Sequence, residues 1–126
     1  MKRIIQTNEA PQAIGPYSQG VIANGMLYAS GQIAIDPKVG DIVAKDIKGQ
    51  VNQVMENIGA LLRAAGLGYE DIVKTTVFLQ DIGDFTTFNE IYASYLSEPY
   101  PARSAVQVGA LPKGALIEIE MIAQMK

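Results

Sequence analysis

The stretch PARSAVQV (residues 101–108), followed by LIEIEMIA (residues 116–123), decides how this sequence is interpreted. Both runs are rich in β-branched residues, and the segment between them holds the turn formers Gly109, Pro112 and Gly114. This pattern predicts two β-strands joined as a hairpin. Each strand also brings charge into an apolar run, which needs an explanation because charged side chains are rarely buried without a partner.

The alternation of side chains along a strand places these charges on defined faces. Arg103, Ala105 and Gln107 share one face of the first strand, and Glu118 and Glu120 share one face of the second. If the hairpin pairs, Arg103 and a glutamate lie on one surface. An arginine fork binds a carboxylate through two parallel hydrogen bonds, and a glutamate can deprotonate a water. The residues leave two interpretations open: a site for a small carboxylate, or a cross-strand ion pair worth roughly 0.2–1 kcal/mol.

Composition narrows the functional classes. The 126 residues predict one domain spanning the whole chain, 1–126. Ten basic and thirteen acidic residues give a net charge of −3 without a basic stripe, which argues against a nucleic-acid partner. The chain has no Cys and no His, so we expect no disulfide, no thiolate chemistry and none of the usual zinc ligands. No Asp/Glu cluster has the spacing of a carboxylate-only site, so we expect no metal. No signal peptide or membrane-length apolar run is present, so we expect a soluble cytoplasmic protein with no membrane partner.

Two segments have the apolar periodicity of amphipathic helices. The first begins after Asp46, a predicted N-cap, and ends at Gly66. Asp84 is the predicted N-cap of the second, which Pro99 and Pro101 terminate. The two apolar stripes comprise Ile47, Val51, Val54, Met55, Ile58, Leu61, Leu62 and Ala65, and Phe85, Phe88, Ile91, Tyr92, Tyr95 and Leu96.

The remaining segments predict strands. Asn24-Gly25 marks a hairpin, and Gly31 within the following strand indicates a bulge or a close backbone approach. With a strand at residues 72–80, the order becomes β-β-β-α-β-α-β-β. We therefore expect an α+β fold, a single mixed β-sheet with two helices packed on one face. The other sheet face is also apolar, so a second subunit is the simplest cover.

Several motifs resemble the Rid (reactive intermediate deaminase, YjgF) family. They are PARS (101–104), LPK (111–113), IEIE (117–120), AIGPYSQ (13–19), SGQI (30–33) and KTTVFL (74–79). The resemblance runs along essentially the whole chain, in order and without large gaps. It implies a chorismate-mutase-like fold and a homotrimer with sites at the subunit interfaces.

The resemblance also implies an activity. Rid proteins hydrolyse reactive 2-enamine and 2-imino acids, such as 2-aminoacrylate and 2-aminocrotonate, to 2-keto acids and ammonia. They protect pyridoxal-phosphate enzymes, which release these intermediates. The implied enzyme is a 2-iminobutanoate/2-iminopropanoate deaminase that needs no cofactor, because positioning and one acid/base group suffice for a reaction that already proceeds in water.

Site residues follow from the same resemblance. Arg103 matches the arginine that clamps the substrate carboxylate, Glu118 the glutamate that positions or deprotonates water, and Tyr17 the tyrosine that closes over the ligand. Ser30, Gly31 and Asn89 match positions that line the substrate pocket.

Ala105 departs from the family pattern, since many members have Cys there. Its backbone still matches a substrate-binding position, but covalent catalysis through that side chain is excluded. Two alternatives to the deaminase remain: a non-catalytic regulatory module that binds small carboxylates, and an RNA-cleaving enzyme, which the acidic charge and the absence of His disfavour.

Overall fold

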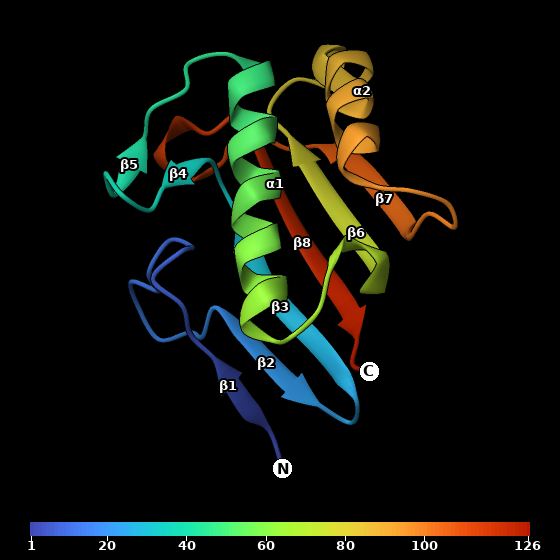
Figure 1. Cartoon of the computed structure of the whole chain (residues 1–126). Helices are drawn as coiled ribbons and strands as arrows, with labels where there is room; N and C mark the ends of the chain where they lie inside the picture. Colours follow the sequence, from blue (N-terminus) through green and yellow to red (C-terminus); the bar gives the residue numbers. More distant parts are fainter.

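Two helices pack on one face of a six-stranded sheet in the computed structural model, which describes residues 1–126 (Figure 1). The strands are β1 (Arg3–Ile5), β2 (Gly20–Ala23), β3 (Met26–Gln32), β6 (Ile72–Leu79), β7 (Ala102–Gln107) and β8 (Ile117–Gln124), in the spatial order β1-β2-β3-β8-β6-β7. The helices are α1 (Ile47–Ala64) and α2 (Phe85–Tyr95), and β4 (Ile35–Asp36) pairs with β5 (Asp41–Ile42) in a separate small ribbon. The predicted α+β fold and the order of its main elements are confirmed.

The predicted C-terminal hairpin is wrong. β6 lies between β7 and β8, parallel to β7 and antiparallel to β8. After β6 the chain forms α2 over one face of the sheet and returns as β7, which pairs with β6. Two parallel neighbours require a crossover connection of this kind. The turn formers between residues 109 and 114 therefore join two strands that are not neighbours.

The strand register separates the two charged positions of greatest interest. Val77 of β6 pairs with Ala105 on one side and with Ile119 on the other, so these three side chains share the face covered by the helices. Arg103 shares that face with Ala105. Glu118 pairs with Phe78 and points to the opposite face. The expectation that Arg103 and Glu118 share a surface is therefore wrong within one chain.

The helix ends follow the sequence signals in one case and only partly in the other. Asp46 caps α1, since its Oδ1 accepts a hydrogen bond of 3.0 Å from the Gly49 amide. Asp84 occupies the N-cap position of α2, but its side chain makes no capping hydrogen bond. Instead, Asp81 accepts from the Gly83 amide in the short 3-10 turn before α2.

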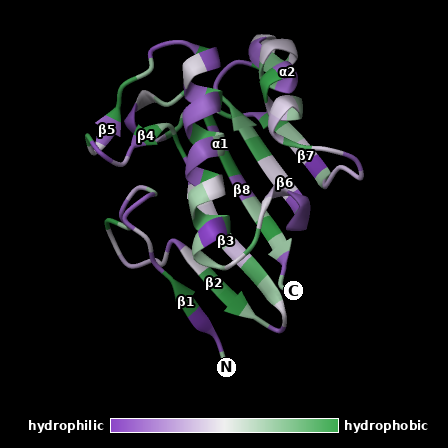
Figure 2. Cartoon of the chain, in the orientation of Figure 1, coloured by the Kyte–Doolittle hydropathy of each residue, from purple (hydrophilic) through white to green (hydrophobic).

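The core lies between the helices and the sheet. The alternate β8 residues Ile117, Ile119, Met121 and Ala123 are buried against it, as their spacing predicts. Hydrophobic residues recur along β2, β6 and β8, while α1 turns hydrophilic residues outward (Figure 2). On the uncovered sheet face Tyr28 and Val106 are exposed, so part of the apolar surface of this sheet remains without cover.

Candidate functional site

A cavity of about 370 Å³ brings together four of the predicted site residues. Tyr17 comes from the loop before β2, Ser30 and Gly31 from the end of β3, and Glu118 from β8. The full lining is Pro11, Gln12, Ile14, Tyr17, Gln19, Ser30, Gly31, Gln32, Ile33, Ile35, Pro112, Lys113 and Glu118. One carboxylate in a mainly uncharged cavity can position a water molecule and accept or donate its proton.

Gly31 is the point where the backbone of β3 approaches Glu118. The β3–β8 register shifts between Ala29 and Gln32, so Gly31 lies in an irregular stretch of the ladder. A Cβ placed at Gly31 would lie 2.9 Å from the carboxyl carbon of Glu118. The close approach predicted for this glycine is confirmed, because any side chain at this position would force the Glu118 carboxylate to move.

The environment of Glu118 favours its protonated form. Partial burial raises the pKa of its carboxyl above the usual value, and the negative charge of Glu120 raises it further. A carboxyl with a raised pKa exchanges protons closer to neutral pH than an exposed glutamate does. This is the behaviour expected of a general acid or base.

Gln19 organises the loop that presents Tyr17. Its side chain is 3% exposed, accepts a hydrogen bond from the Thr7 amide and donates to the carbonyls of Thr7 and Pro11. The Ser30 hydroxyl donates to the Ser18 carbonyl over 2.6 Å and ties the same loop to β3. Gln19 is a site-forming residue that the sequence interpretation missed, although it lies within one of the quoted motifs.

Lys113 is a second residue of this cavity that was missed. It has a left-handed backbone, with φ of 57°, in the short turn before β8. Its Nζ lies 3.6 Å from the Asp41 carboxylate, which forms an exposed ion pair between this turn and the β4–β5 ribbon. The position of Lys113 in the LPK motif was the only sequence signal for its role. Turn-forming residues by themselves do not show which cavity a side chain lines.

Arg103 lies in a separate cluster on the helix-covered side of the sheet. Its guanidinium is 5.2 Å from the Phe85 ring centroid, 5.5 Å from Phe88 and 5.2 Å from Tyr92. Arg103 Nη1 donates to Oδ1 of Asn89 over 2.6 Å. A neighbouring cavity of about 440 Å³ is lined by Asn89, Tyr92, Ala93, Tyr100, Pro101 and Arg103. Arg103 and Asn89 are therefore together, as predicted, but apart from Tyr17, Ser30, Gly31 and Glu118.

No carboxylate neutralises Arg103 within the chain. The two ion pairs of the structure are Lys113–Asp41 and Lys126–Asp71, so the cross-strand pair between Arg103 and Glu118 is absent. A half-buried guanidinium that is hydrogen-bonded only to a neutral amide retains its capacity to bind an anion. Ala105 lies two residues further along β7 on the same face and packs on the core, without lining either cavity.

Comparison with known proteins places this arrangement in a family. A family model described as endoribonuclease L-PSP matches residues 7–125. The structure superposes with a TM-score of 0.97 on the Rid family protein YyfA of Yersinia pestis, with 53% identity, covering 99% of this chain and 100% of the other. The chain belongs to the Rid family.

Relatives of this Rid protein have diverse names. It is 50% identical over 123 residues to the human 2-iminobutanoate/2-iminopropanoate deaminase, covering 98% of this chain and 90% of the relative. It is 53% identical over 124 residues to a Lactococcus lactis protein named as a regulator, AldR, covering 98% of each. Escherichia coli TdcF, solved with bound serine, superposes with a TM-score of 0.93 at 47% identity, covering 98% of this chain and 99% of the other.

This Rid protein presents neither a metal-binding cluster nor a membrane-spanning helix. No group of three or more His, Cys, Asp or Glu side chains is arranged to hold a metal ion. Neither helix has the length and apolar character needed to cross a membrane.

Proposed function

We propose that this protein hydrolyses 2-imino acids and their enamine tautomers, including 2-aminoacrylate and 2-aminocrotonate, to 2-keto acids and ammonia. The main supporting observation is Arg103, a half-buried cation with no carboxylate partner in the chain. The raised pKa of Glu118 beside a cavity supplies the second requirement, an acid/base group. Identity of about half to the human, rat and bovine 2-iminobutanoate/2-iminopropanoate deaminases supports the same reaction.

The complete site, in this proposal, forms between subunits of a homotrimer. Arg103 and Glu118 lie on opposite faces of one sheet, so a single chain does not present both to one small substrate. A neighbouring copy that packs against the uncovered sheet face would bring its own Arg103 cluster towards the cavity of Glu118. The exposed apolar side chains of Tyr28 and Val106 on that face favour such packing.

The chemistry assigns one task to each group. Arg103 binds the substrate carboxylate and orients the imine, and Glu118 accepts a proton as water attacks the imine carbon. The attack forms a carbinolamine with one new C–O bond. Glu118 passes the proton from water to the imine nitrogen, which completes the neutral carbinolamine. It then takes the hydroxyl proton and delivers it to nitrogen as the C–N bond breaks, so that ammonia leaves and the ketone forms. Water is the only co-reactant and no electrons are exchanged, so the reaction requires no cofactor.

The physiological role follows from the reactivity of the substrate. Enamines of this class inactivate pyridoxal-phosphate enzymes, so faster hydrolysis in the cytoplasm protects those enzymes. Serine bound to TdcF shows that this structural neighbour accommodates a small amino acid with one carboxylate, the same size class as the proposed substrate. The name of AldR favours the alternative, a regulator that binds small carboxylates without turnover.

Stopped-flow kinetics tests the proposal. A serine/threonine dehydratase generates the enamine, and its decay is followed with wild type, Arg103→Ala, Glu118→Gln or no added protein. We expect faster decay with wild type only, and a loss of kcat/KM on the order of a hundredfold or more in either variant.

Two other outcomes would decide against the deaminase. Equal decay in all four reactions, together with saturable binding of 2-oxobutanoate, would favour the regulatory module. Cleavage of RNA that Arg103→Ala abolishes would favour the nuclease activity named in the description of the family, whereas cleavage that survives this substitution would arise outside the proposed site.

A further inference from the structure

The surroundings of Arg103 are more specialised than carboxylate binding alone requires. Three aromatic rings of α2 contact its guanidinium, all with centroids within about 6 Å, the distance at which a cation–π interaction is effective. Phe88 and Tyr92 are themselves buried, at 0% and 5% exposure, so the rings cannot move without disturbing the core. A rigid aromatic surface of this kind restricts the rotamers of a long, flexible side chain.

Asn89 supplies the one hydrogen bond to this guanidinium, and its chemistry is informative. An amide oxygen accepts from Nη1 without adding negative charge, so the arginine is held but not neutralised. A carboxylate at the same place would pair with Arg103 and compete with the substrate. Asn89 therefore contacts the arginine directly, and it also lines the cavity beside it.

A buried hydroxyl pair fixes the ring of Tyr92. Its hydroxyl lies 2.7 Å from Oγ1 of Thr75, a buried β6 residue that pairs directly with Arg103 in the parallel ladder. The contact joins α2 to the sheet below the guanidinium. Burial raises the pKa of Tyr92, so its hydroxyl stays protonated and remains available for this bond. Loss of either hydroxyl would leave a buried polar group without a partner.

We propose that Asn89, Tyr92 and Thr75 are positioning residues that hold the Arg103 guanidinium in place and uncompensated, ready for a substrate carboxylate. The inference rests on the proposed function, since it explains how the carboxylate clamp is prepared. It assigns to α2 the task of limiting the entropy that Arg103 loses on binding, a general route to higher affinity.

Calorimetric titration with one charged and one uncharged ligand tests the inference. The probes are 2-oxobutanoate and 2-oxobutanamide, which differ only in the carboxylate. The decisive variant is Asn89→Asp. The position is exposed, and the new carboxylate forms a stronger bond to Arg103 than the amide does. We expect its thermal stability to be equal or higher and its Kd for 2-oxobutanoate to be about tenfold weaker, with the Kd for the amide unchanged. Unchanged Kd values for both probes would overturn the inference.

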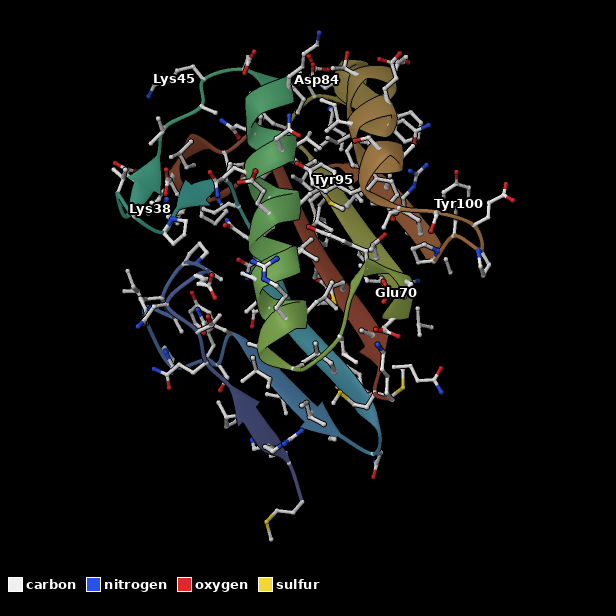
Figure 3. All side chains as sticks on the ribbon, in the orientation of Figure 1. Lys38, Lys45, Glu70, Asp84, Tyr95 and Tyr100 are labelled. Carbon is white, nitrogen blue, oxygen red and sulfur yellow. The ribbon has the colours of Figure 1, made fainter.

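Tyr92→Phe provides a second, independent variant with a matched control. It should weaken 2-oxobutanoate binding about threefold, as expected if the ring is less well fixed. Tyr95→Phe, on the same helix, also removes a tyrosine hydroxyl, but one that donates to Asn52 of α1 and lies away from Arg103. Figure 3 shows Tyr95 directed into the space between α1 and α2. This control should bind both probes as wild type does.

Failure of the inference and failure of the proposed function give different results. If wild type prefers 2-oxobutanoate, Arg103→Ala loses that preference, and Asn89→Asp and Tyr92→Phe keep it, the positioning role is overturned while the clamp stands. If wild type itself shows no preference for the carboxylate, the clamp is overturned and the positioning role with it.

Discussion

At the scale of single residues, one contact defines the chemistry of the Glu118 cavity. The absence of a side chain at Gly31 makes room for a carboxylate, and the partial burial of that carboxylate shifts its proton affinity. The position of the Glu118 carboxylate therefore depends on Gly31, and its proton affinity depends on its surroundings. One substitution can change the position of the carboxylate, and another can change its pKa.

Gly31→Ala changes the geometry. The added methyl overlaps the Glu118 carboxyl group, so that side chain must rotate away from its position over the cavity. We expect kcat/KM for the enamine to fall about a hundredfold, the effect of a misplacement near 1 Å in a catalytic group. Gly109→Ala is the control, since nothing lies within 4 Å of its added Cβ. Wild-type kinetics in Gly31→Ala would contradict a catalytic position for Glu118.

Glu120→Gln changes the electrostatics. Glu118 must be ionised to accept a proton, so activity should fall as the pH drops through its pKa, which lies above the usual value. Removing the negative charge of Glu120 lowers that pKa, so the acidic limb of the pH–kcat/KM profile should move to lower pH. Glu70→Gln should leave the profile unchanged, because Glu70 lies in the turn before β6 (Figure 3) and does not line the cavity. An unmoved limb in Glu120→Gln would argue against Glu118 as the base.

At the scale of the elements, α1 and α2 differ in how they begin. Both have an aspartate at the N-cap position, yet only Asp46 bonds a backbone amide of its helix. The 3-10 turn before α2 is capped instead, since Asp81 accepts from its Gly83 amide. Composition at the N-cap predicts where a helix starts, whereas the backbone conformation of the preceding residues decides which side chain caps it.

A matched pair of substitutions measures this difference. Asp46→Ala should lower the free energy of unfolding by about 1 kcal/mol, the usual cost of losing a side-chain cap. Asp84→Ala should cost only a few tenths of a kcal/mol, from the loss of a negative charge near the start of α2. Urea denaturation followed by circular dichroism measures both values. Equal losses would show that the Asp46 bond adds nothing to stability.

At the scale of the whole molecule, the separation of Arg103 from Glu118 is the central feature. The helices cover one face of the sheet and leave the other open, and the two groups lie on different sides of this division (Figure 1). A sheet with one bare apolar face gains from association, because that surface is removed from water. Assembly and the completion of the site therefore have a common physical origin in the proposed homotrimer.

Tyr28→Glu tests the link between assembly and activity. Tyr28 is 47% exposed on the open sheet face, and a charge there opposes burial against a second copy. We expect a smaller particle in sedimentation equilibrium and a parallel loss of activity. Val39→Glu, at a 64% exposed position in the β4–β5 turn, should change neither. A monomeric wild type with full activity would exclude an interfacial site.

The sequence by itself determined the two helices and the six main strands, which side chains of one strand share a face, and the irregular backbone at Gly31. These depend on local periodicity and on conformational preferences that act over a few residues. The family motifs supplied the remaining site residues, whereas Gln19 and Lys113 were missed because their roles depend on distant partners.

Only the tertiary structure decided which strands are neighbours. β7 pairs with β6 because the α2 crossover returns the chain to that edge, and β8 enters on the other side of β6. The turn between residues 109 and 114 does not reveal this insertion, because local turn chemistry is the same for a hairpin and for a longer crossing. The register of β7 and β8 on this inserted strand thus places Arg103 and Glu118 on opposite faces of the sheet.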